Sequence, residues 1–269
     1  MSPSLPPEIL DLIVDHLCHE RNTLKTCCLA SKSWVPRTRR HLFAHVCFQF
    51  RKSVKRWMQL FPDPSNSPAH HTRSLRIGTP ALTLIMSSFA RPLVCSFRFV
   101  VRLRLGSCRR DEFSKTIDLI CSFPLLEHLS LWSPASDNDT GNVWVPPSTS
   151  PKLTGSLVLE GDGVGAIIPP FLSLPGGLQF THIQAPCSVG NVDSIQNLLL
   201  GCSSTLESLR ISCYTPRAFS SAPVADEQCL IATTLFRQIS ETASARPLQN
   251  HRTQTCRLLV GHPGCSVDH

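Results

Sequence analysis

The sequence has no long hydrophobic run and no export signal. None of its apolar stretches approaches the roughly 18 to 20 residues that a membrane-spanning helix needs. The first residues, MSPSLPPE, lack the basic and then apolar layout of a signal peptide. We therefore expect a protein of the cytoplasm, the nucleus or both, in which the 13 cysteines are reduced thiols and not a disulfide framework.

The sequence also lacks the common catalytic and cofactor-binding motifs. It contains no G-x-S-x-G, no H-E-x-x-H and no Walker phosphate loop. Cys256, His262, Cys265 and His269 are spaced as in some zinc sites, but the tight C-x₂₋₄-C pair that usually opens a structural zinc site is missing. We expect no catalytic residue, no cofactor and no bound metal, and hence a protein that is not an enzyme.

Acidic residues are absent from one long segment. Residues 21–62 contain ten lysines and arginines and no aspartate or glutamate, so this segment carries a charge of +10. Because the net charge of the whole chain is +7, the remaining residues together carry −3. A one-sided basic band predicts an acidic protein partner or nucleic acid. The alternative is the solvated surface of a small helical domain.

The segment 5–17, LPPEILDLIVDHL, is unusually apolar for a short helix. Two prolines near its start suit the first turn of a helix, which Ser4 can cap. Its apolar residues cover roughly 200° of the helical wheel, whereas a helix lying on one core needs only about 100°. They are Ile9, Leu10, Leu12, Ile13, Val14 and Leu17. We expect this helix to contact its own domain on one side and a partner on the other.

Two more helices are expected directly after it. Residues 22–32 have Asn22 as a cap and an apolar side, and residues 33–48 form a third, partly irregular helix with Trp34 and Val46 among its apolar anchors. Three short helices in about 45 residues bury too little surface for a secure core. A partner that covers the spare face of the first helix would stabilise such a domain.

Residues 5–47 resemble an F-box, and especially the F-boxes of mushroom-type fungi. The pattern is an L-P-x-E start, an apolar helix, and a lysine and tryptophan followed by a basic stretch. It is carried by Leu5, Pro6, Glu8, Ile9, Leu10, Ile13, Leu17, Leu24, the run from Cys28 to Trp34 (CLASKSW), Leu42 and Phe43. The sequence departs from the pattern at Ala30-Ser31, where Val-Cys or a similar pair is frequent.

The resemblance implies that this segment binds Skp1, the adaptor of SCF ubiquitin ligases, which connects it to a cullin and a RING protein. Skp1-type adaptors are acidic, so the basic band fits this partner. The residues implied in Skp1 binding are Leu5, Pro6, Ile9, Leu10, Ile13, Leu17, Leu29, Trp34, Leu42 and Phe43.

In the rest of the chain an apolar-x-x-L-x-L frame recurs, most clearly as VVRLRL, LLEHLSL and TLESLRI. Its anchors follow one another at steps of 26 to 28 residues; they are Leu75, Leu103, Leu129, Leu157, Ile183 and Leu209. Such a step is typical of leucine-rich repeats, in which a short strand alternates with a returning helix. Apolar periodicity predicts two of those helices, at 112–123 and 191–202. The alternative is an unrelated α/β domain whose leucine pairs lie on ordinary buried strands.

We therefore predict a small all-α three-helix F-box followed by an α/β leucine-rich-repeat-like solenoid. The predicted parts are an F-box at 3–47, a linker at 48–71, the repeat domain at 72–213 and an irregular region or tail at 214–269. The corresponding function is that of the substrate-recognition subunit of an SCF-type ubiquitin ligase, with an unidentified protein substrate on the repeats. The alternatives are a repeat scaffold that joins no ligase and, third, a nucleic-acid-binding protein that uses residues 21–62.

Overall fold

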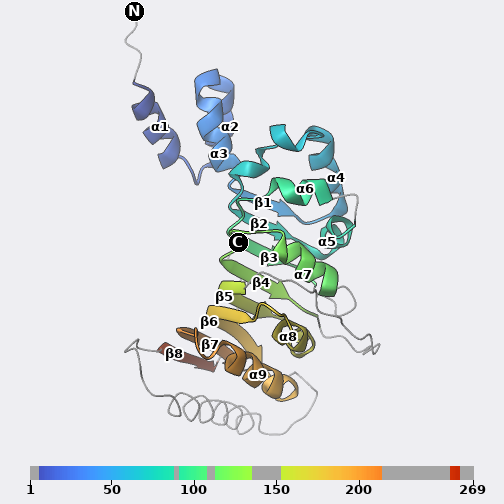
Figure 1. Ribbon diagram of the computed structural model, residues 1–269. Helices are drawn as coiled ribbons and strands as arrows, with labels where there is room; N and C mark the ends of the chain where they lie inside the picture. The colour runs from blue at the N-terminus through green and yellow to red at the C-terminus, as the bar shows by residue number, and fades with distance from the viewer. Residues whose placement is uncertain (1–5, 88–90, 108–112, 135–152, 214–254, 261–269) are drawn as a thin grey trace, which may run out of the picture. The chain divides into compact units, whose positions relative to one another are not determined.

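The computed structural model divides into two compact units. The first comprises residues 1–106 together with 118–126, and the second comprises residues 107–117 together with 127–269. The residues that the structure describes are 6–87, 91–107, 113–134, 153–213 and 255–260 (Figure 1).

The first unit begins with three short helices and one 3-10 turn. They are α1 (Pro7–His16), α2 (Arg21–Ala30), η1 (Lys32–Trp34) and α3 (Val35–Leu42). Pro7 and Pro36 stand in the first turns of α1 and α3, where the missing N–H of proline costs no helical hydrogen bond. The side chain of Ser31 accepts a hydrogen bond from the backbone N–H of Ser33, which starts η1 directly after α2. All three expected helices form, although the third ends at Leu42 and not at residue 48.

Three parallel strands follow in the same unit. They are β1 (His45–Phe48), β2 (Ser74–Ile77) and β3 (Arg102–Leu105). Their register places Val46 opposite Leu75, and Leu75 opposite Leu103. These three side chains are buried, whereas alternate positions such as Arg76 and Arg102 are exposed, as the pleat of a strand requires.

The remaining elements of the first unit are α4 (Arg51–Leu60), η2 (Pro64–Asn66), η3 (Pro68–His71), α5 (Thr79–Ile85) and α6 (Arg91–Ser96). Helices α4 to α6 lie on the same side of β1 to β3 (Figure 1).

An aromatic cluster connects these strands with the end of α3. The ring of Trp57 lies 5.7 Å from that of Phe43, 5.5 Å from Phe48 and 5.6 Å from Phe97. Aromatic pairs of this kind stabilise a fold beyond the area that they bury. Trp57 therefore fixes α4 against both β1 and the residue that follows α3.

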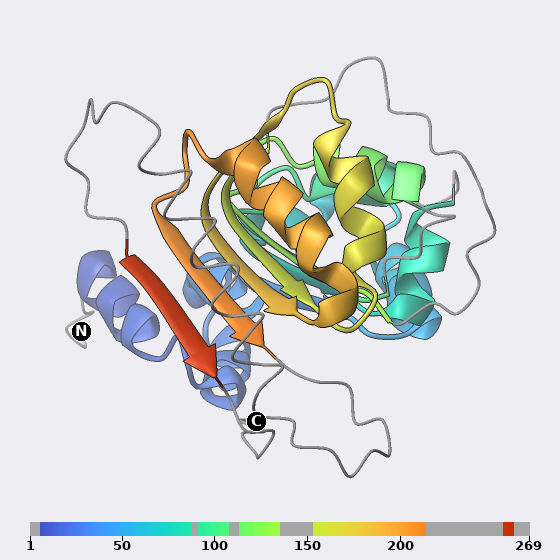
Figure 2. The same ribbon diagram turned by 90° about the horizontal axis from the view of Figure 1, so that it is seen from below.

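The second unit is built from parallel strands and helices in alternation. The strands are β4 (His128–Trp132), β5 (Leu153–Glu160), β6 (Leu178–Cys187), β7 (Ser208–Cys213) and β8 (Thr255–Val260). The helical elements are α8 (Val164–Leu172), η6 (Val189–Asn191) and α9 (Val192–Cys202), while the residues of α7 (Phe113–Cys121) are divided between the two units. Figure 2 shows α8 and α9 over one face of the strands and β8 beside β7.

The predicted repeat anchors all lie on strands and are all buried. Leu75 and Leu103 are aligned in the first unit, and Leu129, Leu157, Ile183 and Leu209 are aligned in the second. The helices predicted at 112–123 and 191–202 are confirmed as α7 and α9. A constant sequence step therefore corresponds to a constant position on successive parallel strands.

The predicted fold class, a small all-α F-box followed by a leucine-rich-repeat-like solenoid, was wrong. The structure is a mixed α/β fold whose described strands are all parallel, and the three first helices share one compact unit with β1, β2 and β3. The physical reason lies directly after α3. The Thr72 hydroxyl donates to the carbonyl of Phe43 at 2.9 Å, and the Arg73 N–H donates to the carbonyl of Ala44 at 2.9 Å, so the end of α3 is bonded to the start of β2.

Several segments differ from the interpretation of the sequence. The segment 48–71, interpreted as a linker, contains α4, η2 and η3, and the segment 214–269 contains β8. Helix α8, which was not predicted from the sequence, contains Pro169 and Pro170 in its interior. Helix α8 buries four apolar side chains, and this packing offsets the low helix propensity of the two prolines. The buried side chains are Val164, Ile167, Ile168 and Phe171. Ser4, Leu5, His262, Cys265 and His269 lie outside the described residues.

Candidate partner-docking site

Helix α1 has two apolar faces with opposite environments. Leu10, Val14 and Leu17 recur at steps of four and three, and they face the interior: Val14 is only 1% exposed, and the other two are half-buried. Ile9 and Ile13 lie one turn apart on another face, and they are 43% and 42% exposed.

The exposed face of α1 contains one more large residue. Leu12, three positions after Ile9, is 55% exposed, and Pro6, three positions before Ile9, is exposed as well. On α2, Leu29 is 88% exposed. Isolated exposed leucines are ordinary on protein surfaces, but several on one short helix indicate an interaction surface. We call Pro6, Ile9, Leu12 and Ile13 the apolar face of α1.

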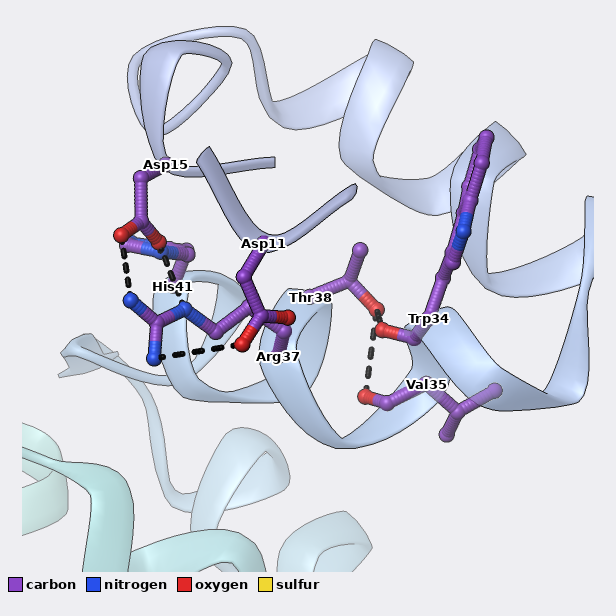
Figure 3. Close-up of polar contacts among 7 residues, drawn as sticks. All are labelled: Asp11, Asp15, Trp34, Val35, Arg37, Thr38 and His41. Carbon is purple, nitrogen blue, oxygen red and sulfur yellow. Dashed lines mark hydrogen bonds and ion pairs between the residues drawn. The ribbon is translucent and has the colours of Figure 1, made fainter. Parts of the chain in front are cut away.

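A cluster of charged side chains fixes α1 on α3. Asp15 accepts hydrogen bonds from Arg37 Nε at 2.7 Å and from His41 Nε2 at 2.7 Å, and a second bond from the Arg37 guanidinium makes that pair bidentate. Arg37 also lies 4.0 Å from Asp11 (Figure 3). A bidentate contact between a guanidinium and a carboxylate fixes the relative orientation of the two side chains as well as their distance. The hydrogen bonds from Arg37 and then from His41 hold the pKa of Asp15 well below its usual range.

A buried hydroxyl connects α2 to α3. The side chain of Thr38 is fully buried, and its O–H lies within donating distance of the carbonyls of Trp34 and Val35, at 2.8 and 3.1 Å (Figure 3). Because that single proton is used for the carbonyls, the oxygen accepts from the Cys28 thiol. Cys27 and Leu24 of α2 are buried as small apolar residues. The polar contacts of Thr38 and Asp15 thus hold α2 and α1, respectively, against α3.

The residues implied in adaptor binding fall into three groups. Pro6, Ile9, Ile13 and Leu29 are exposed, as a docking surface requires. A second group is half-buried within the first unit: Leu10, Leu17, Trp34, Leu42 and Phe43. Phe43 packs on Trp57 and Phe61, with ring centroids 5.7 and 6.4 Å apart. Leu5 lies outside the described residues.

Leu12 is the residue of this face that sequence reasoning missed. It belongs to the wide apolar arc of the segment 5–17, but it is not part of the F-box pattern quoted for this chain. Its step of three from Ile9 was the available signal, because residues three apart share a helix face.

The basic band is mostly solvated in the structure. Eight of its ten cations are exposed, and they are Arg21, Lys25, Lys32, Arg40, Arg51, Lys52, Lys55 and Arg56. Arg37 is engaged with Asp15, and Arg39 is half-buried. Exposed lysines and arginines without acidic residues among them produce a positive potential that attracts an acidic partner.

Metal ligands, membrane-spanning helices and reactive thiols are other features that could indicate a function. Among the described residues no three His, Cys, Asp or Glu side chains gather as metal ligands, and no described helix is long and apolar enough to cross a bilayer. Burial raises the pKa of the Cys121 thiol to about 11 and that of Cys202 to about 11. These thiols are therefore protonated at neutral pH and are poor nucleophiles.

The chain was compared with protein-family models, with curated proteins and with solved structures. None of the three comparisons gives a match.

Proposed function

We propose that the chain is the substrate-recognition subunit of an SCF-type ubiquitin ligase. Helices α1 to α3 dock onto a Skp1-like adaptor, and through it onto a cullin and a RING protein. The α/β part after residue 47 holds a protein substrate. The complex would act in the cytoplasm, the nucleus or both.

The observation that carries this proposal is the apolar face of α1. The opposite face of the same helix packs within the first unit, and Asp15 fixes the helix to Arg37, so Ile9 and Ile13 are held outward on a rigid element. Interface energy concentrates in a few apolar anchors of this kind, surrounded by a polar rim. The exposed cations nearby in sequence, Arg21, Lys25 and Lys32, suit an acidic adaptor.

In this role the chain makes and breaks no covalent bond. It keeps a bound substrate close to the conjugating enzyme that the RING protein brings, and so raises the effective concentration of substrate lysines at the reactive thioester. Rigid seating of α1 matters for this mechanism, because a loosely held helix would let the substrate move away from the reactive centre.

The proposal is tested with purified chain and purified Skp1 by isothermal titration calorimetry. Replacing Ile9 and Ile13 together by alanine should weaken binding by about tenfold or more, since a lost anchor costs about 2 kcal/mol and 1.4 kcal/mol is a factor of ten. The matched control replaces Leu60 and Leu200 by alanine, because both are exposed leucines outside α1. It should bind like the wild type.

Two outcomes would contradict the proposal. If the wild-type chain shows no binding to Skp1, or if the control loses as much affinity as the variant, α1 is not an adaptor surface. A chain that binds partner proteins without Skp1 or cullin fits a scaffold that joins no ligase. Binding to nucleic acid with a steep loss of affinity in salt would instead assign the exposed cations to phosphate contacts.

A further inference from the structure

Basic side chains line a cavity of about 380 Å³ in the first unit. It lies where the end of α3, the turn η3 and the residue before β2 meet. Its lining residues are Arg40, His41, Ala44, His70, His71 and Arg73, and none of these described residues is acidic. The volume lies within the range of small-ligand sites.

Helix α3 supplies two of the five basic side chains that line the cavity. Arg40 and His41 stand in the last turn of α3, where cations are favoured by the helix dipole. His70, His71 and Arg73 come from a segment some thirty residues further along, and the helix dipole does not require them. The imidazole rings of His70 and His71 lie with centroids 3.9 Å apart. Positive charges this close repel each other, and a nearby anion offsets such repulsion.

Protein contacts fix three of the lining side chains. Arg73 donates to the carbonyl of Phe99 at 3.3 Å, and its guanidinium lies 5.2 Å from the centre of the Phe99 ring. His70 Nδ1 donates to the carbonyl of Ser67 at 2.7 Å, which leaves Nε2 for another partner. His41 is held by Asp15. Side chains fixed in this way lose little conformational freedom when a ligand binds.

Burial and nearby positive charges disfavour the protonated form of His71. Burial, and then the charges of His70, Arg39, Arg40 and Arg73, lower the pKa of His71 below its ordinary value. Asp15 is bonded to His41 of the lining and is not itself a lining residue. A bound anion would offset this repulsion.

We propose that this cavity binds the dianion of a phosphate group, with Arg40 and Arg73 as its principal donors and His70 and His71 as additional donors. Guanidinium groups match phosphate oxygens in geometry and keep their charge at every physiological pH. The phosphate could be free or could belong to a phosphorylated side chain of a protein, because both present the same dianion. The site is independent of the apolar face of α1 and of the ligase proposal.

The first experiment titrates the full chain with inorganic phosphate at low ionic strength and follows the ring resonances of His70 and His71 by NMR. Saturable shifts of both rings are expected. Arg40→Gln should weaken binding by about tenfold, because a hydrogen bond to a charged group contributes about that factor. Arg40 is an exposed lining residue, so its replacement should leave the circular dichroism unchanged.

The matched control is Arg76→Gln, since Arg76 is an exposed arginine on β2, close to Arg73 in sequence but outside the cavity. It should bind phosphate like the wild type. Shifts that do not saturate, or an equal loss in Arg40→Gln and Arg76→Gln, would overturn the proposal, because the attraction would then be that of diffuse surface charge.

A second arm distinguishes the two sources of phosphate. A phosphoserine peptide is compared with its unphosphorylated twin and with inorganic phosphate. Tighter binding of the phosphopeptide than of inorganic phosphate, lost in Arg40→Gln, assigns the site to a phosphorylated protein. Equal binding of peptide and free phosphate assigns it to the free anion.

A third arm tests the histidines in the wild-type chain without any substitution. Sulfate stays a dianion across the neutral range, so a change of its affinity with pH reports only the protein. Its binding should tighten as the pH falls below the ordinary histidine pKa of about 6.5, because protonation of His71, whose pKa is lowered by burial and by nearby cations, adds a positive charge to the cavity. Sulfate binding that is independent of pH would remove these histidines from the site.

Discussion

Helices α1 and α9 are similar in length and in apolar content but differ in how many apolar side chains they bury. α9 buries Ile195, Leu198, Leu199 and Cys202, which recur at helical steps, and leaves Leu200 exposed. Among the side chains of α1 that the structure describes, only Val14 is fully buried, and Ile9, Leu12 and Ile13 are exposed.

The difference follows from what each helix lies on. α9 lies over β6 of its own unit, so its apolar stripe meets a sheet (Figure 2). Among the described elements, the main contacts of α1 are with α3 and η1, and they include the hydrogen bonds from Arg37 and His41 to Asp15. A helix on a sheet gains its stability from burial, whereas α1 keeps a large apolar surface for another molecule. The free energy of unfolding should therefore respond very differently to substitutions in the two helices.

The largest effect is expected in α9. Ile195→Ala removes a fully buried side chain and should lower the free energy of unfolding by about 2 to 5 kcal/mol, through lost transfer energy and the cavity left behind. Urea unfolding followed by circular dichroism measures it. Leu200→Ala in the same helix should change the value by less than about 0.5 kcal/mol. Equal losses in the two variants would mean that α9 does not pack as described.

An intermediate effect is expected from the charged contact that holds α1. Asp15 is a third exposed, so Asp15→Asn should cost no more than about 1 kcal/mol at neutral pH. The pKa of Asp15 is lowered on folding, so its contribution is fully present above the unfolded pKa of about 4 and is lost as the pH falls below that value. The wild type and Asp15→Asn should therefore converge in stability in acid.

A double-mutant cycle identifies the partner of Asp15. Arg37→Gln and Asp15→Asn combined should cost less than the sum of the two single losses, because both substitutions remove the Asp15–Arg37 contact, whereas Arg37→Gln alone leaves the bond from His41 to Asp15. Fully additive losses would show that Asp15 and Arg37 do not stabilise the fold through their mutual contact.

The strands from β2 to β7 were largely predictable from the sequence, whereas β1 and β8 were not. The anchors from Leu75 to Leu209 repeat at a nearly constant step, and a constant step places them on successive strands. Val46 lies in register with Leu75 and belongs to the same series. It was assigned to a helix because Leu42 and Val46 are four residues apart, which imitates one helical turn. That assignment placed the helices in a domain without strands, which is why the fold class was wrong.

The candidate docking site was predictable as a helix but not as a surface. Periodicity identified the wide apolar arc of the segment 5–17, and the structure confirms that part of it is exposed. It could not tell Leu10, which faces the interior, from Ile9, which does not, because both are equally apolar. The contact of Asp15 with Arg37 decides the orientation, and it joins residues 22 positions apart for which the sequence gives no spacing rule.

The smallest effect on stability is expected on the apolar face of α1. Replacing Ile9, Leu12 and Ile13 together by alanine removes three large side chains that are about half exposed, so little buried surface is lost. Alanine is also a better helix former than isoleucine, which offsets part of that loss. The free energy of unfolding of the isolated chain should change by less than about 0.5 kcal/mol. Val14→Ala, on the opposite face, should cost about 1 to 2 kcal/mol for its two buried carbon atoms. A triple variant that unfolds more readily than Val14→Ala would show that the exposed face already packs within the chain, and that it is not kept free for a partner.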